Sequence, residues 1–153
     1  LAEAEERLQM LALLLAGERD VSPWDTELTR SGPSYTVDTL RELRALVPAE
    51  TRLYLILGED NLAGFPRWRE AEELVRLAQP IVVHRAGSAD GLDASNLSAE
   101  ARTRLALGRL ASPALAVSST ELRAALARGE ACDEHFSPAL GAHVARRGLY
   151  RRP

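Results

Sequence analysis

The chain has 153 residues, of which 46% are hydrophobic and 27% are charged, and its formal net charge is −3. These values fit one globular domain over residues 1–153 with a sizeable core. No basic tract exceeds two consecutive arginines near the C-terminus, which argues against a nucleic-acid partner. No apolar run approaches the roughly 20 residues of a membrane-spanning helix. The single cysteine, Cys132, excludes an internal disulfide and favours the cytoplasm.

Apolar residues at helical spacing alternate along the chain with short apolar runs that predict strands. In chain order the pattern predicts a helix at 2–16, a short strand at 21–28, a helix from 36 that ends before Pro48, a strand at 53–57, a helix over 71–78, a strand at 81–83, a loop at 86–97, a short helix at 98–107, a strand at 114–117, and helices at 119–128 and 138–147. The uninterrupted run at 53–57 predicts a strand buried on both faces.

Strands that alternate with helices predict an α/β fold with a parallel sheet and crossover helices. Ligands of such sheets gather beyond the carboxyl ends of the strands. We therefore expect functional residues in the loops after Leu57 and Val117, and in the turn that precedes the helix at 36. These segments carry unusual polar and aromatic residues.

The segment SSTELR at 118–123 follows an apolar run and opens a helix. The first turn of a helix has unpaired N–H groups and partial positive charge, so hydroxyl side chains there predict an anion site. Arg123 lies one turn further along, and its planar guanidinium suits phosphate oxygens. The other interpretation of Ser118 and Glu121 is a capping box, which only starts a helix.

Three segments carry a family resemblance when they are taken together. GPSYTVDTL at 32–40, LGEDNLAGFPRW at 57–68 and VSSTELR at 117–123 closely resemble bacterial nicotinate-nucleotide adenylyltransferases, as does the closing GLY at 148–150. The resemblance covers essentially the whole chain. It implies a Rossmann-like nucleotidyltransferase fold and an enzyme of NAD biosynthesis that transfers AMP from ATP to nicotinate mononucleotide, giving deamido-NAD and pyrophosphate with Mg²⁺ as cofactor on the ATP phosphates.

The resemblance also implies roles for single residues. Ser118, Ser119, Thr120 and Arg123 match the motif that holds the ATP phosphates, and Arg123 is the expected catalytic residue. The residues that match the mononucleotide site are Thr36 and Arg69 through their backbone, Trp68 through its ring, and Asp60.

The chemistry of these residue types agrees with the implied roles. A Trp face attracts the positively charged pyridinium ring of the mononucleotide by stacking and through its quadrupole. The alternatives are a core aromatic for Trp68 and a turn or capping residue for Asp60. We expect Ser34 to cap the helix that starts at 36 and Tyr35 to pack in the core.

The chain departs from the family pattern at its start. The family's first strand and its paired-histidine HxGH motif have no counterpart in this sequence, so the segment that contains them is expected to be missing. His135 and His143 are expected at the surface, and no catalytic histidine or protein-only metal site is assigned.

Several functional alternatives remain open at this point. Within the superfamily, the acceptor could be nicotinamide mononucleotide or phosphopantetheine, although Trp68 and the Ser-Tyr-Thr segment argue against phosphopantetheine. A different class of function is a non-catalytic nucleotide-binding remnant. The sequence is also compatible with a homo-oligomer.

Overall fold

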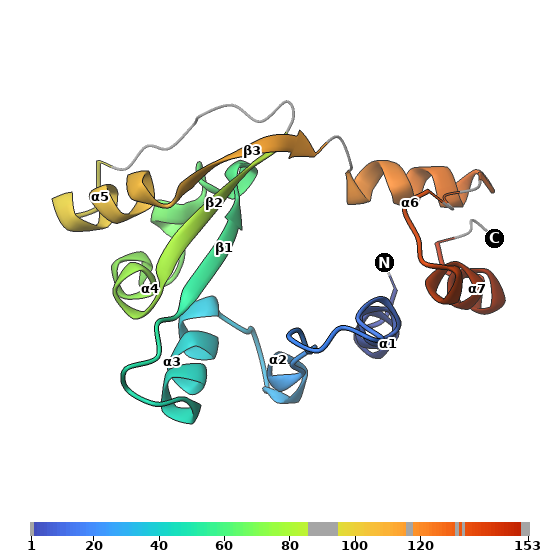
Figure 1. The fold of residues 1–153 in the computed structure, drawn as a ribbon, viewed down its shortest axis with the longest axis horizontal. Helices are drawn as coiled ribbons and strands as arrows, with labels where there is room; N and C mark the ends of the chain where they lie inside the picture. The colour runs from blue at the N-terminus through green and yellow to red at the C-terminus, as the bar shows by residue number, and fades with distance from the viewer. Residues whose placement is uncertain (1, 86–94, 116–117, 131, 133, 151–153) are drawn as a thin grey trace. The chain divides into compact units, whose positions relative to one another are not determined.

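The computed structural model describes residues 2–85, 95–115, 118–130, 132 and 134–150 (Figure 1). By internal contacts the chain divides into two compact units, residues 1–30 with 117–153 and residues 31–116. Each unit is described by itself. Within the described ranges, no helix is both long and apolar enough to cross a membrane.

The unit of residues 31–116 is built on a parallel sheet. Its strands are β1 (Tyr54–Gly58), β2 (Gln79–Arg85) and β3 (Arg109–Leu115), in the order β1-β2-β3. Parallel neighbours need a crossover. Here α4 (Ala71–Leu77) joins β1 to β2, α5 (Ala99–Leu107) joins β2 to β3, and α3 (Thr36–Leu46) precedes the sheet. The predicted α/β class and parallel sheet are confirmed.

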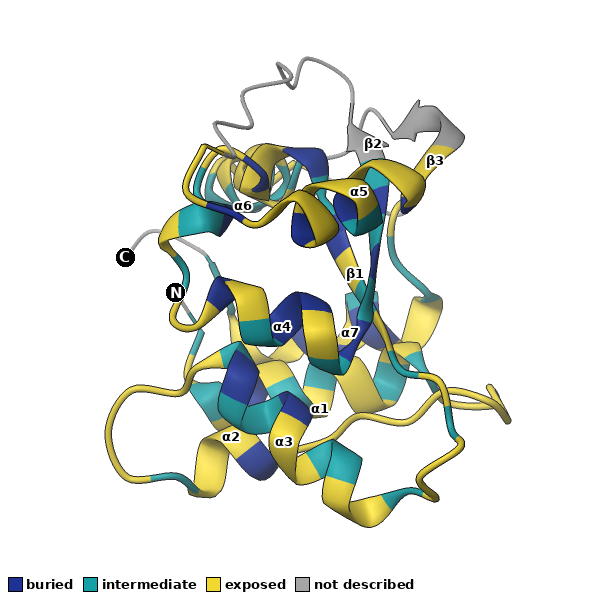
Figure 2. Ribbon diagram, turned by 90° about the vertical axis from the view of Figure 1, so that its left-hand side faces the viewer, coloured by how far each residue is buried: buried dark blue, intermediate teal, exposed yellow. Residues whose placement is uncertain are grey.

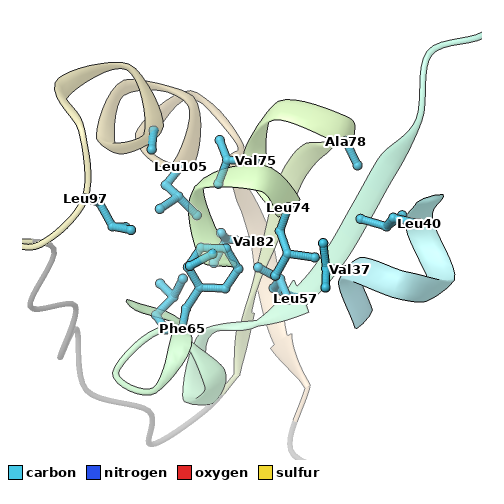
Figure 3. Close-up of a cluster of buried hydrophobic side chains, with 13 residues drawn as sticks. Val37, Leu40, Leu57, Phe65, Leu74, Val75, Ala78, Val82, Leu97 and Leu105 are labelled. Carbon is cyan, nitrogen blue, oxygen red and sulfur yellow. The ribbon is translucent and has the colours of Figure 1, made fainter. Parts of the chain in front are cut away.

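The core of this unit lies between the sheet and its helices (Figure 3). Side chains of α3, α4 and α5 converge there on Leu57 and Val82 of the strands. The predicted inward stripe of the third helix is confirmed, since residues 71, 74, 75 and 78 are all buried. Figure 2 shows the same helix with one buried and one exposed side, as expected of an amphipathic helix that covers a sheet.

The prediction that the first strand of this sheet is buried on both faces is wrong. Leu53, Leu55 and Leu57 face the core, whereas Tyr54 and Ile56 between them are 53% and 71% exposed. Side chains of a strand alternate between its two faces. The described helices of this unit therefore cover only the leucine side.

The unit of residues 1–30 and 117–153 is helical in its described part. It contains α1 (Ala4–Leu14), α2 (Thr26–Thr29), α6 (Ser119–Ala127) and α7 (Pro138–Arg147), so the predicted helices at 2–16, 119–128 and 138–147 are confirmed with small shifts of their ends. The predicted strand at 21–28 is wrong. Residues 21–25 have no regular structure, and Val21 is exposed because no described strand of this unit offers it a partner.

A buried polar cluster joins the first and last helices of this unit. The Glu6 carboxylate accepts a hydrogen bond from Arg147 of α7 and lies 3.0 Å from Nε2 of His143. His143 is only 5% exposed, so the expectation that it lies at the surface is wrong. Buried charges are tolerated in proteins when they are paired in this way. The hydrogen bond from Arg147, helped by His143, lowers the pKa of Glu6 against the opposing effect of burial.

This lowered pKa predicts an acid-sensitive contact between α1 and α7. A carboxylate with a depressed folded-state pKa contributes stability above its ordinary pKa of 4.5, and that stability is lost as the pH falls through the folded value. Thermal unfolding midpoints measured from pH 6 to about pH 3 should therefore fall less steeply for Glu6→Gln than for the unaltered protein. Glu5→Gln, at an exposed neighbouring position, is the control and should follow the unaltered protein. Parallel curves for all three proteins would contradict the prediction.

Candidate functional site

A pocket of about 260 Å³ opens between the start of α3 and the segment that leads into α4. It brings together two stretches that are about thirty residues apart in the sequence. Its lining consists of Ser34, Tyr35, Thr36, Arg67, Trp68, Arg69 and Leu74. Three residues predicted for the mononucleotide site, at positions 36, 68 and 69, therefore line the same pocket.

The position of Trp68 depends on a buried aromatic neighbour. The short 3₁₀ helix η2 (Phe65–Arg67) contains Phe65, whose side chain is fully buried in the core. The backbone N–H of Trp68 donates to the Phe65 carbonyl at 2.9 Å, and the centroids of the two rings lie 5.5 Å apart with an interplanar angle of 43°. A tilted aromatic pair at this separation is favourable. Trp68 is thus fixed at its base by the core, while it is half-buried and borders the pocket.

The opposite wall of the pocket is the first turn of α3. Thr36 is the first helical residue, and its N–H is one of the amides that have no acceptor within the helix. Tyr35 is the N-cap residue, and the Arg69 guanidinium lies over its ring at 4.6 Å. Such a cation–π contact joins the two walls. A helix start with arginines nearby is suited to an anion.

This geometry corrects two sequence expectations. Tyr35 is 37% exposed and lines the pocket instead of packing in the core. Ser34 also lines the pocket, and the N-cap position that it was expected to hold belongs to Tyr35. The helix starts one residue later than a Ser34 cap would require.

Asp60 lies apart from this pocket lining. It belongs to η1 (Glu59–Asn61), which follows β1 directly, and its side chain is exposed at the carboxyl end of that strand. Its Oδ1 is 3.5 Å from the Asn61 amide nitrogen. The carboxylate folds back over Gly58, where an added Cβ would come within 2.4 Å of Oδ1. The binding role of Asp60 stays a prediction.

The second predicted site is the start of α6, in the other unit. Ser118 is the N-cap, and its hydroxyl accepts from the Thr120 N–H at 3.2 Å, not from that of Glu121. Arg123 Nη2 donates to the Thr120 hydroxyl at 3.3 Å, which holds the guanidinium beside the helix start. Hydroxyls, a guanidinium and the positive end of the helix dipole are thus gathered at one place.

Two further observations concern metal binding and the surroundings of the pocket. Across the described part of the chain, no three His, Cys, Asp or Glu side chains are grouped closely enough to hold a metal ion. Glu70, next to the pocket, has a left-handed backbone with φ 53°, and no sequence pattern predicted its involvement.

Comparison with known proteins identifies the family. The family model described as Cytidylyltransferase-like matches residues 1–125. A probable nicotinate-nucleotide adenylyltransferase of Dehalococcoides mccartyi is 37% identical over 99% of this chain and 74% of its own length. The chain belongs to the nicotinate-nucleotide adenylyltransferase family. A second relative with the same name, from Chromobacterium violaceum, is 36% identical over 98% of the chain and 76% of its own length.

Solved structures of this family share the fold. A Plasmodium falciparum nicotinic acid mononucleotide adenylyltransferase complexed with APC has a TM-score of 0.71 and 21% identity, covering 98% of this chain and 77% of that one. The same protein complexed with NaAD gives a TM-score of 0.67 over 98% and 75% of the two chains. The predicted Rossmann-like nucleotidyltransferase fold is confirmed.

Proposed function

We propose that this protein catalyses adenylyl transfer from ATP to nicotinate mononucleotide, giving deamido-NAD and pyrophosphate, as a step of pyridine nucleotide biosynthesis in the cytoplasm. The observation that carries the proposal is the pocket in which the first turn of α3 faces Trp68 and Arg69. Family membership supports the reaction class.

The pocket offers two kinds of group that a pyridine carboxylate needs. The Trp68 ring borders it and can stack on the positively charged pyridinium. The backbone N–H groups of Thr36 and Arg69 can donate to the carboxylate, and the dipole of α3 adds positive potential at its start. Its volume of about 260 Å³ is below that of a typical drug-sized site, so it suits the ring end of the nucleotide and not the whole product.

The charge of the lining favours the acid over the amide. Arg67 and Arg69 both border the pocket, and among the described residues that line it none has a carboxylate. A carboxylate gains from this positive potential, whereas the neutral carboxamide of nicotinamide mononucleotide gains much less. The aromatic lining likewise gives phosphopantetheine, which has no ring to stack, little to recognise.

The start of α6 supplies groups for the phosphates. In the transfer, a phosphate oxygen of the mononucleotide attacks the α-phosphorus of ATP, a new P–O–P bond forms, and the bond to the leaving pyrophosphate breaks. Negative charge then grows on the pyrophosphate. The Ser118, Ser119 and Thr120 segment and the Arg123 guanidinium are suited to hold and stabilise it. Mg²⁺ is expected to enter bound to ATP and to neutralise part of the same charge.

The direct test is pyrophosphate release with ATP, Mg²⁺ and one acceptor at a time. We expect kcat/KM for nicotinate mononucleotide to exceed that for nicotinamide mononucleotide by about tenfold or more, and phosphopantetheine to be inactive. Equal values for acid and amide would contradict the charge argument. Nucleotide binding without pyrophosphate release from any acceptor would favour the non-catalytic alternative.

Removal of the Trp68 ring should weaken the mononucleotide specifically. Loss of stacking and cation–π attraction is worth about 1–2 kcal/mol, so Trp68→Ala should raise the KM for nicotinate mononucleotide roughly 5- to 30-fold and change the KM for ATP much less. Trp24→Ala, at an exposed tryptophan of the other unit, is the matched control. An unchanged mononucleotide KM in a folded Trp68→Ala protein would reject the role.

Substitution of Arg123 should reduce turnover even when the charge is kept. Arg123→Lys loses the planar fork that fits phosphate oxygens, so kcat should fall about tenfold or more, and Arg123→Ala should fall further. Arg128→Lys, at the C-terminal end of the same helix, where the arginine pairs with Glu130, should leave kcat unchanged. Full turnover in both Arg123 variants would leave Arg123 as a residue of the helix surface only.

A further inference from the structure

Glu70 has a backbone conformation that its own side chain does not favour. Its φ and ψ are 53° and 48°, in the left-handed region, where a residue with a Cβ is disfavoured relative to glycine. It occupies the N-cap position of α4 but forms no capping hydrogen bond with its side chain. Local capping therefore does not explain why the chain adopts this turn directly after Trp68 and Arg69. A contact from elsewhere must favour it.

That contact is a two-point ion pair with α3. Arg41 Nη1 donates to Glu70 Oε1 at 3.1 Å, and Nη2 donates to Oε2 at 2.5 Å. The planar guanidinium fixes the orientation of the carboxylate as well as its distance. Arg41 lowers the pKa of Glu70, so the pair is fully ionised near neutral pH.

The pair spans the two walls of the pocket. Arg41 belongs to the helix whose first turn contains Thr36, and Glu70 follows Trp68 and Arg69 directly. A second contact, Arg69 over the Tyr35 ring, joins the same two walls. The separation between the Thr36 amide and the Trp68 ring thus depends on both contacts.

Stability alone does not account for this pair. Its side chains are 43% and 42% exposed, and exposed ion pairs contribute little to the free energy of folding. The Arg41–Glu70 pair therefore contributes little to stability but has a defined geometry, as expected of a contact that positions neighbouring groups.

We propose that Arg41 and Glu70 are positioning residues of the mononucleotide pocket, which hold the Trp68–Arg69 segment at a fixed distance from the start of α3. The proposal rests on the proposed function for its substrate, but the geometry that it describes exists without substrate. Two readouts therefore test it separately.

The first readout needs no substrate. The chain has two tryptophans, so in a Trp24→Phe background Trp68 is the sole tryptophan, and excitation at a wavelength that tyrosine does not absorb reports on Trp68 alone. Acrylamide quenching of Trp68 should rise about twofold in Glu70→Gln and in Arg41→Met, because either change frees the segment from α3. Glu130→Gln is the matched control, since Glu130 forms a two-point exposed ion pair with Arg128 in the other unit. Unchanged quenching in both variants would overturn the proposal, whatever the substrate is.

The second readout is kinetic. Glu70→Gln and Arg41→Met should each raise the KM for nicotinate mononucleotide about fivefold or more, with kcat and the KM for ATP nearly unchanged. The double variant should be no worse than either single one, because both remove the same contact. Additive effects, or a loss of thermal stability that accounts for the KM change, would overturn the positioning role. The proposed function would fail separately if the unaltered protein did not turn over the mononucleotide. The rise of Trp68 quenching in the two variants would still support the positioning role.

Discussion

The candidate site depends on one property of the α-helix, which is that its first turn has amide groups without acceptors inside the helix. The chain uses this property twice. At Thr36 the helix start meets a pocket bordered by Trp68 and two arginines, and at Ser118 it is joined by hydroxyls and Arg123. At each start the unpaired donors and the helix dipole act in the same direction, which suits an anion.

The hydrophobic core is part of this site and not only its support. Phe65 is fully buried among residues of α4, α5 and the strands, and it contacts the ring of Trp68. The short segment 65–68 therefore contributes Phe65 to the core and Trp68 to the pocket lining. Buried side chains are close-packed and have few alternative rotamers. The buried Phe65 therefore fixes the position of the half-buried Trp68 ring that it contacts. Changes at Phe65 should consequently affect ligand binding as well as folding.

Periodicity in the sequence predicted most of the fold because α3, α4, α5 and α7 each bury apolar residues at helical spacing. The stripe of α4 and the ends of α7 follow from spacing and from Ser137, Pro138 and Gly148 at its termini. The strand at 21–28 was predicted wrongly because a local pattern does not supply a neighbouring strand. His143 was misplaced because its partner, Glu6, is 137 residues away. For the site, the motifs predicted Thr36, Trp68 and Arg69, which line one pocket, and the α6 start, and their binding roles stay predictions. No motif pointed to Glu70, because its left-handed backbone and its pairing with a distant arginine leave no local pattern.

The charges of the residues around the pocket, and not the net charge of the chain, determine whether the pocket favours an anionic ligand. The chain carries a net charge of −3, yet the pocket is bordered by Arg67 and Arg69, and the carboxylate of Glu70, which lies beside Arg69, is paired with Arg41. If Glu70 were not held by Arg41, its carboxylate could compete for Arg69, which already lies 3.7 Å from it. The Arg41–Glu70 pair thus has an electrostatic effect in addition to its geometric one. It neutralises the Glu70 carboxylate next to Arg69 and leaves positive potential for an incoming anion. Because a neutral amide would gain little from that potential, the proposed preference for an acid follows from the pairing of Arg41 on α3 with Glu70 at the start of α4.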